Sequence, residues 1–346
     1  MPQPRITAPL SRRGLLTAGG ALGAGAVLTA CGGNGDSDVS ATSSASGGGS
    51  WIFTDDRKKK LTAKTAPKHI VAFTGVAAAL VDFGIDDRIV GVFGETKLAN
   101  GKADPQAGDL DISKVTILGN VWGEFNIEKY AALDPDLLVT HQYESSSLWY
   151  VPTESEKKIL ALAPSAAITV ARVPLTTPIQ RYAELAESLG ADLGAAKVTE
   201  AKARFEKAAA TLRSAAKASG GLQVLAASAS ASIFYASNPG VSSDLMYFKS
   251  LGVDIVVPTK LDKGDYFESL SWENADKYDA DLIILDNRAS ALQPKDLTSK
   301  AAWKALPAVK AGQIAEWDAV PRFSYAGAAP LLENLAAAIS KSKKLS

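Results

Sequence analysis

The chain has 346 residues, with 37 basic and 37 acidic side chains, so its formal net charge at neutral pH is zero. This balance provides no basic surface of the kind that binds nucleic acid. A single cysteine cannot form a disulfide bond within the chain, so its stability must come from the burial of a core.

The first 30 residues have the pattern of an export signal. Arg12 and Arg13 precede a Gly/Ala/Leu segment that is too short and too rich in glycine to span a bilayer. The small residues before Cys31 resemble the lipobox of bacterial lipoproteins, in which the cysteine is acylated and becomes the new N-terminus. We therefore expect a Tat-type lipoprotein signal peptide over 1–30, with a lone core or reactive thiol as the alternative interpretation of Cys31.

The segment that follows, 31–50, consists almost entirely of small and polar residues. Such a composition has little to bury and is typical of a flexible tether. We expect an extracytoplasmic protein that the lipid on Cys31 anchors to the outer face of the cytoplasmic membrane.

From Lys68 onward, short apolar runs alternate with helical patterns, which predicts an α/β fold with mainly parallel sheets. Five runs predict the strands of an N-terminal lobe over 51–177: HIVAF (69–73), IVGVFG (89–94), VTILG (115–119), LLVT (137–140) and AAITVA (166–171). Five more predict a C-terminal lobe over 220–346, which closes with a final helix: VLAASA (224–229), SIFYAS (232–237), DIVVP (254–258), DLIILD (281–286) and QIAEWDA (313–319).

Between the lobes, residues 178–219 form the most helical segment of the chain. Pro178 begins one helix that ends at Gly190, and a second helix runs from about Ala195 to Ala218. Six apolar residues recur along the second helix at steps of three and four: Val198, Ala201, Phe205, Ala208, Leu212 and Ala215. At about 1.5 Å per residue this helix can cross between lobes. We therefore predict two Rossmann-like lobes joined by one long α-helix, with small relative motion; an ordinary surface helix is the alternative.

Three phrases of the sequence are similar to those of a known family: NIEKYAALDPDLLVT (126–140), SLSWENADKYDADLIILD (269–286) and AWKALPAVKAGQI (302–314). With the helical linker, they resemble the helix-linked (class III) substrate-binding lipoproteins of ABC importers, which take up ferric siderophores, haem and cobalamin. The resemblance implies a protein that is not an enzyme, has no cofactor and delivers its ligand to a membrane permease. We expect it to act as a monomer.

Two glutamates match the permease-docking positions of this family. In the family, one glutamate on each lobe pairs with arginines of the permease, and Glu128 and Glu273 occupy these positions. Each is also expected in the first turn of a helix. Favourable interaction with the helix dipole, worth about 0.3–1 kcal/mol, is the alternative role.

In open α/β sheets, ligands bind beyond the carboxyl ends of the strands. Aromatic and arginine side chains gather after the predicted strands or in the loops beside them, and we predict that they line the ligand cleft: Trp122, Tyr143, Trp149, Tyr150, Arg172, Tyr235, Trp272, Arg288, Trp317, Arg322 and Tyr325. Arg288 and Arg322 rank highest because each follows a clear strand. A salt bridge to a neighbouring acid, such as Asp286 or Asp318, is the alternative for both.

This mixture of side chains suits an iron(III)-siderophore complex. Its metal is already enclosed by six oxygens, so the protein need supply no direct metal ligand. Arginine can donate to chelating oxygens without removing the iron, and aromatic rings can cover the linkers between them. Because few lysines lie near the strand ends, we expect a hydroxamate-type ligand, which carries less negative charge than a catecholate or citrate complex. Three arginines pointing inward together would favour an anionic complex instead.

Other ligands and an enzymatic role remain as alternatives. Haem needs an axial ligand, for which His141 with Tyr143 is the candidate, since His69 precedes its strand. Two scattered histidines cannot build a zinc or manganese site. Cobalamin remains possible, because its site needs mostly aromatic side chains and a fitting shape, for which a sequence has no clear motif. A secreted α/β enzyme is the remote alternative, because the chain has no GxGxxG, GxxxxGK or GxSxG motif after a strand.

Overall fold

The structure is a computed structural model that describes residues 50–345. The predicted signal peptide over 1–30 and Cys31 lie outside the described residues. Across the described part, none of the helices has the length and apolar character needed to cross a membrane.

The first lobe contains a five-stranded sheet in which every neighbouring pair is parallel. Its strands, in spatial order, are β5 (Thr116–Ile117), β4 (Ile89–Phe93), β3 (Ile70–Phe73), β6 (Leu137–Gln142) and β7 (Ser165–Thr169). The central strands β3 and β6 are buried along their whole length, as expected of apolar strands covered on both faces. All five strands match predicted runs. An antiparallel hairpin of β1 (Trp51–Thr54) and β2 (Lys60–Ala63) was not predicted.

The second lobe contains a mixed sheet. Its strands, in spatial order, are β11 (Phe267–Ser271), β9 (Ile233–Ser237), β8 (Gln223–Ala229), β12 (Leu282–Asp286) and β13 (Ile314–Trp317), with β10 (Asp254–Ile255) paired to β8. Strands β8, β10, β12 and β13 are parallel, but β9 is antiparallel to β8 and β11 is antiparallel to β9. The short connection over 230–232 allows only a hairpin, because a parallel crossover needs a dozen or more residues.

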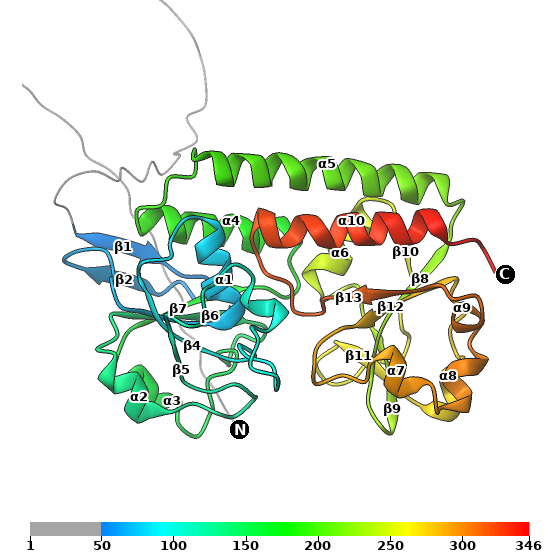
Figure 1. Cartoon of the computed structure of the whole chain (residues 1–346), viewed down its shortest axis with the longest axis horizontal. Helices are drawn as coiled ribbons and strands as arrows, with labels where there is room; N and C mark the ends of the chain where they lie inside the picture. Colours follow the sequence, from blue (N-terminus) through cyan, green and yellow to red (C-terminus); the bar gives the residue numbers. More distant parts are fainter. Residues whose placement is uncertain (1–49, 346) are drawn as a thin grey trace, which may run out of the picture. The chain divides into compact units, whose positions relative to one another are not determined.

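Two helices follow the first lobe: α4 (Thr176–Ser188) and α5 (Ala196–Ala218). Between them Gly190 has a φ of +100°, which favours glycine and ends the first helix. Helix α4 packs on the first lobe, whereas α5 packs along the final helix, α10 (Tyr325–Lys341). Figure 1 shows α5 and α10 side by side above both sheets. The predicted helical connection between two lobes is confirmed.

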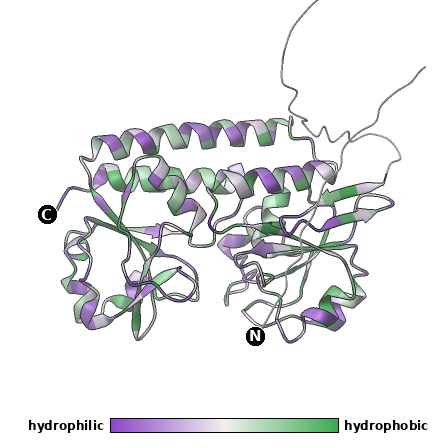
Figure 2. Ribbon diagram, turned by 180° about the vertical axis from the view of Figure 1, so that it is seen from behind, coloured by the Kyte–Doolittle hydropathy of each residue, from purple (hydrophilic) through white to green (hydrophobic). Residues whose placement is uncertain are grey.

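The remaining helices are short and flank the sheets: α1 (Thr74–Asp82), η1 (Pro105–Ala107), α2 (Ile127–Ala132), α3 (Glu156–Leu160), α6 (Ser243–Ser250), η2 (Trp272–Asn274), α7 (Pro294–Leu297), α8 (Ala301–Ala305) and α9 (Pro307–Lys310). Hydrophilic and hydrophobic residues alternate along α5 in Figure 2. This is the pattern of a helix with one buried face, and five of the six residues in the predicted stripe are buried; the exception is Ala201.

The two lobes are also connected by packing beyond α5. Between β7 and α4, the backbone N–H of Arg172 donates to the carbonyl of Val241 at 2.9 Å. Before α10, Phe323 packs against His141 and Tyr182 in the first lobe, with ring centroids 5.1 and 6.4 Å away. One hydrophobic core includes the first lobe, α5, α10 and one face of the second sheet. Because close-packed cores resist deformation, this sharing favours small relative motion of the lobes.

Candidate functional site

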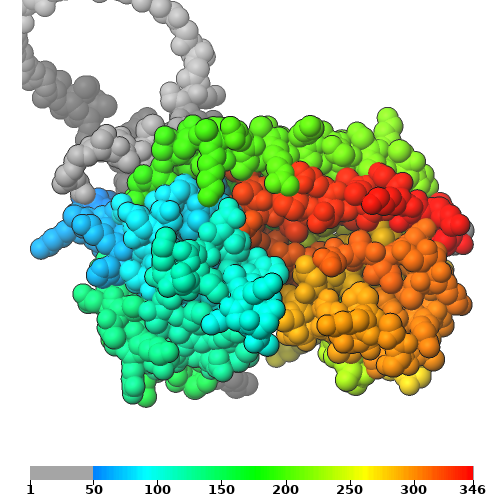
Figure 3. Space-filling view, viewed as in Figure 1, coloured from blue at the N-terminus to red at the C-terminus, as the bar shows by residue number. Residues whose placement is uncertain are grey.

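Two adjoining cavities lie between the lobes. The larger, of about 550 Å³, is lined by first-lobe residues, among them Glu95, Trp122 and Trp149, and by the second-lobe segment 288–290. The smaller, of about 150 Å³, shares Glu95, Asp104 and Arg288 with the larger one. Figure 3 shows the notch between the two lobes on the side away from α5 and α10. Both sheets therefore contribute loops to one cleft.

An aromatic cluster forms the first-lobe wall of the larger cavity. Trp122 is 63% exposed although it contacts Trp149 and Tyr150, with ring centroids 4.9 and 5.0 Å away. Behind them, Tyr143 lies 4.5 Å from Trp149. The Tyr143 hydroxyl and the Trp149 indole nitrogen are buried without a hydrogen-bond partner within 50–345. An exposed indole over a well-packed aromatic base provides an apolar surface for a ligand.

Tyr150 adopts a left-handed backbone conformation, with a φ of +61°. For a bulky residue this conformation costs about 1–3 kcal/mol, and it persists only where the surroundings enforce it. Here the Tyr150 ring packs against Phe73, the last residue of β3, with ring centroids 5.2 Å apart. The sheet thus holds the Tyr150 side chain at the cavity wall.

Arg288 supplies the positive charge on the second-lobe wall. Its Nε lies 3.0 and 3.1 Å from the two carboxylate oxygens of Asp286, and its Nη2 donates to Oδ2 at 2.6 Å. Asp286 is fully buried at the end of β12 and also accepts a hydrogen bond from Ser228. Burial alone would lower the pKa of Arg288, but the hydrogen bonds to Asp286 raise it above its ordinary value. Arg288 is therefore a permanent, oriented cation, and its Nη1 makes no hydrogen bond within the described residues.

Three carboxyl groups lie around Arg288. Glu95 and Asp104 line both cavities, and Asp318 lines the smaller one. Burial raises the pKa of Glu95 and of Asp104, and it raises the pKa of Asp318 to about 7. Glu95 and Asp104 were not among the predicted site residues. Glu95 directly follows the predicted strand over 89–94, so the rule of strand ends could have found it.

Arg172 lies at the rim of the cleft and connects the lobes. Its Nη2 donates to the carbonyl of Gly264 at 2.8 Å, and its Nη1 donates to Glu144 at 3.0 Å. Beside it, the hydroxyl of Tyr266 donates to the carbonyl of Tyr143 at 3.1 Å. The structure therefore places Arg172 in a contact between the lobes and not on the wall of either cavity.

Three other predicted residues lie behind the cleft, near the start of α10. Arg322 forms an ion pair with Asp82 of α1, not with Asp286 or Asp318. Trp317 is buried, and its indole nitrogen donates to Asp244 at 2.6 Å. The ring of Tyr325 packs against those of Phe83 and Phe205. All three are held by contacts within the protein and do not line the two cavities described above. Trp317 and Arg322 line a third cavity, of about 220 Å³, which shares four residues with the smaller one: Pro105, Gln106, Asn287 and Asp318.

Tyr235 and Trp272 also lie outside the two cavities. Tyr235, on β9, packs against Phe267 with ring centroids 5.8 Å apart. The Trp272 indole donates to the carbonyl of Ser230 at 3.3 Å. Of the predicted ligand contacts, the structure thus brings together on the larger cavity Trp122, Trp149, Tyr150 and Arg288, with Tyr143 directly behind them.

Both predicted docking glutamates are exposed. Glu128 lies in the first turn of α2, which Asn126 caps by accepting a hydrogen bond from the backbone N–H of Lys129. Glu273 lies in the 3₁₀ turn η2, so the α-helix expected around it is wrong. In Figure 1, α2 and α8, the helix that contacts η2, lie on the side of their lobes away from α5.

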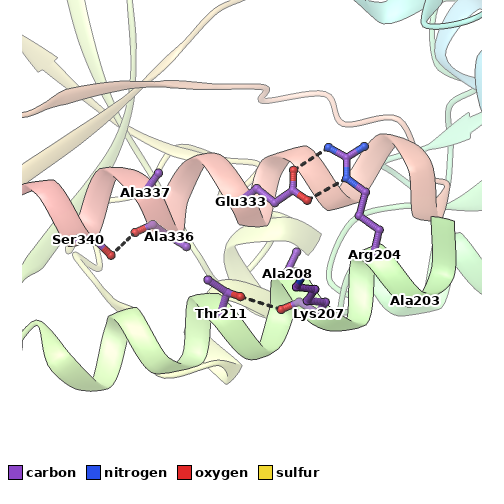
Figure 4. A pocket seen from close by; sticks show the side chains of 9 residues that line it. All are labelled: Ala203, Arg204, Lys207, Ala208, Thr211, Glu333, Ala336, Ala337 and Ser340. Atoms are coloured by element: carbon purple, nitrogen blue, oxygen red, sulfur yellow. Dashed lines mark hydrogen bonds and ion pairs between the residues drawn. The ribbon is translucent and has the colours of Figure 1, made fainter. Parts of the chain in front are cut away.

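A further groove, of about 580 Å³, lies between α5 and α10. Figure 4 shows its lining of small residues and the ion pair of Arg204 with Glu333, whose nitrogen–oxygen distances are 2.8 and 2.7 Å. It shares no residue with the interlobe cavities. Across residues 50–345, no group of three His, Cys, Asp or Glu side chains is placed to hold a metal ion.

Comparison with known proteins identifies the family. The sequence profile described as periplasmic binding protein matches residues 70–321. The crystal structure of DesE, a ferric-siderophore receptor protein from Streptomyces coelicolor, is 55% identical, with a TM-score of 0.83; the match covers 86% of this chain and all of DesE. No curated protein matched the sequence.

More distant structures share the fold. The petrobactin-binding protein YclQ from Bacillus subtilis is 20% identical, with a TM-score of 0.63 and coverage of 84% of this chain and 99% of YclQ. The iron uptake substrate-binding protein PiuA from Streptococcus pneumoniae is 19% identical, with a TM-score of 0.61; the match covers 82% of this chain and 96% of PiuA. The chain therefore belongs to the periplasmic binding protein family, in its helix-linked class III form, whose members are substrate-binding transport proteins and not enzymes.

Proposed function

We propose that this protein captures an iron(III)-siderophore complex outside the cytoplasmic membrane and delivers it to an ABC permease. The observation that carries the proposal is the 55% identity to a ferric-siderophore receptor over that receptor's whole length. The interlobe cavity supports it, since an aromatic wall facing an oriented guanidinium suits a preassembled chelate.

We further propose that the siderophore is of the hydroxamate type. Of the three arginines predicted to bind ligand, Arg288 lines these two cavities and Arg322 lines the third one beside them; Asp286 balances the charge of Arg288, and Asp82 balances that of Arg322. The acidic side chains Glu95 and Asp104 stand on the same walls. A strongly anionic catecholate or citrate complex would meet net repulsion there, whereas a less negatively charged hydroxamate complex would not.

Haem is disfavoured by the position of its candidate axial ligand. His141 is fully buried, its Nδ1 shares a hydrogen bond of 2.7 Å with the hydroxyl of Tyr182, and its ring packs against Phe323. Burial lowers the pKa of His141 to about 3. This histidine is therefore a neutral core residue and does not line either cavity.

We also propose that residues 1–30 are removed as a Tat-type signal, and that lipid on Cys31 anchors a monomeric protein to the outer face of the membrane. This proposal rests on the sequence alone: the twin arginines, the apolar segment and the small residues before Cys31. Segment 31–50 then provides the distance between the membrane and the lobes.

Intrinsic fluorescence tests the proposed ligand. Trp122 and Trp149, two of the six tryptophans, line the larger cavity. Ferrioxamine or ferrichrome is therefore expected to quench the emission in a saturable manner. A ferric catecholate, ferric citrate, haem and cobalamin serve as comparison ligands and are expected to bind more weakly. Saturable quenching by haem or cobalamin, with none by any ferric hydroxamate, would contradict the proposal.

Glu128 and Glu273 are proposed to dock the permease. Replacement of both by alanine is expected to leave ligand affinity unchanged and to reduce cellular uptake by about tenfold or more, since close charge pairs across an interface are worth roughly 1.5 kcal/mol or more each. Glu206→Ala, an exposed site on α5, is the matched control. Uptake of the labelled ferric hydroxamate is measured; equal uptake by the double variant and the control would show that the two glutamates do not dock the permease.

A further inference from the structure

The walls of the smaller cavity are rich in hydrogen-bond acceptors. Glu95, Asp104 and Asp318 line it with their carboxyl groups, and Gln106 lines it with a side-chain amide. The Oε1 atom of Gln106 is buried and has no hydrogen-bond partner within residues 50–345. A buried acceptor without a donor is costly, so this wall favours a ligand group that brings several donors.

The charges around this cavity do not balance. Its one cation is Arg288, whose guanidinium is bound to Asp286 through two nitrogens. Neither Glu95 nor Asp104 forms an ion pair with any described residue; the charges that act on Glu95 are, in order of effect, those of Arg288, Asp104 and Asp286. Lys97 lines only the larger cavity and is exposed. Negatively charged side chains therefore outnumber positively charged ones at the point where the cavities meet.

Burial raises the pKa of both Glu95 and Asp104. Arg288 and a hydrogen bond with Tyr150 act in the opposite sense on Glu95, and the backbone N–H of Gln106 donates to Asp104 at 2.9 Å, so the loss of water outweighs the partners that each carboxylate has. A cation placed between them would offset this cost. Desolvated carboxylates form strong charge-assisted hydrogen bonds with an ammonium group, which has three donors and no acceptor.

The two cavities differ in size, so each can hold a different part of a ligand. At about 550 Å³ the larger one lies in the usual range for small-molecule sites, whereas 150 Å³ is too small for a complete chelate. The smaller cavity opens beside the larger one, through Glu95, Asp104 and Arg288. An arm extending from a chelate in the larger cavity can therefore enter it.

We propose that the ligand is a ferric hydroxamate with a free alkylammonium arm, and that this arm enters the smaller cavity, where Glu95, Asp104 and the Gln106 carbonyl accept its hydrogen bonds. This inference rests on the proposed function, the capture of a ferric siderophore. It makes Glu95 and Asp104 determinants of specificity, because they distinguish ligands that share one iron centre and differ in a single charge.

Two forms of one chelate test the inference. Ferrioxamine B carries a free ammonium, and its N-acetyl derivative has the same iron centre without that charge. Dissociation constants for both are measured by tryptophan quenching at fixed pH and ionic strength. The wild-type protein is expected to bind the free amine about 10- to 100-fold more tightly, the range for a charge-assisted hydrogen bond to a buried group.

The isosteric variants Glu95→Gln, Asp104→Asn and their combination assign this preference to residues. The combined variant is expected to bring the ratio of the two dissociation constants close to one, and each single variant to lower it in part. Glu154→Gln, an exposed glutamate outside both cavities, is the control and keeps the wild-type ratio. Thermal melts of each variant verify folding, and the single variants serve if the combination does not fold.

The outcomes separate the inference from the function on which it rests. Tight binding of both forms with equal affinity by the wild-type protein overturns the ammonium site and leaves siderophore capture standing. A preference that persists in the combined variant overturns the assignment to Glu95 and Asp104. Binding of neither form, nor of any other ferric hydroxamate, overturns the proposed function itself.

Discussion

Replacement of Arg288 by alanine is expected to weaken the binding of a ferric hydroxamate by about 10- to 100-fold. Arg288 lines both interlobe cavities, and its Nη1 makes no hydrogen bond within the described residues, so it can donate to a chelating oxygen. Hydrogen bonds to charged groups contribute about 1.5–3 kcal/mol, which corresponds to this change in affinity. The dissociation constant is measured by tryptophan quenching.

The same replacement is expected to destabilise the fold, because it leaves the buried carboxylate of Asp286 without its cation. Removal of one partner of a buried ion pair costs about 3–5 kcal/mol. A double variant, Asp286→Asn with Arg288→Ala, separates the two effects: it removes both charges, is expected to recover most of the stability, and still binds weakly. If the double variant binds as tightly as the wild type, Arg288 acts through folding and does not contact the ligand.

The sequence predicts strands well where burial on both faces requires a continuous apolar run. All ten predicted runs form strands, from HIVAF at β3 to QIAEWDA at β13. Strand β11, FESLS, was missed because it lies at the edge of the second sheet and only some of its residues face the core. Whether β9 is parallel or antiparallel to β8 depends on the length of the loop between them, and an apolar run by itself does not predict strand direction.

The site was predicted in part, for a related physical reason. Trp122, Trp149, Tyr150 and Arg288 follow strands whose ends meet at the cleft, so local sequence is enough to place them. The environment of Arg322 depends on Asp82, which lies 240 positions earlier in the chain. Glu95 was not predicted for a different reason: the oxygens of a chelate call for hydrogen-bond donors, whereas a carboxylate is an acceptor.

Replacement of Arg322 by alanine is expected to reduce the free energy of unfolding by about 3 kcal/mol or more and to change ligand affinity little. The sequence alone predicts the reverse, a loss of binding with folding intact. In the structure Arg322 is mostly buried and lies 3.2 Å from Asp82, whose side chain also accepts a hydrogen bond from Ser324. Alanine at position 322 leaves the Asp82 carboxylate buried without its cation, which is the costly case for a buried pair.

The position of this pair explains why its loss should affect the whole fold. Asp82 ends α1 in the first lobe, and Ser324 caps α10 by accepting a hydrogen bond from the backbone N–H of Gly327 at 2.9 Å. The guanidinium also packs so closely on Gly108 that a Cβ there would lie 1.5 Å from its Nη1. One carboxylate thus connects the first lobe to the start of the helix that packs along α5.

A double-mutant cycle of Asp82→Ala and Arg322→Ala, followed by urea unfolding, measures the coupling. The free energy of unfolding is expected to fall in each single variant by more than half of its fall in the double variant. Each single variant leaves one charge buried and unpaired, whereas the double variant leaves none. Arg204→Ala, which breaks the exposed ion pair with Glu333, is the matched control and is expected to cost at most about 1 kcal/mol. If the Arg322→Ala protein unfolds as the wild type does and binds ferric hydroxamate tenfold more weakly, the prediction is wrong and Arg322 contacts the ligand. The expected result instead makes it a residue that holds the two lobes in register, so that the cleft between them is formed before the ligand arrives.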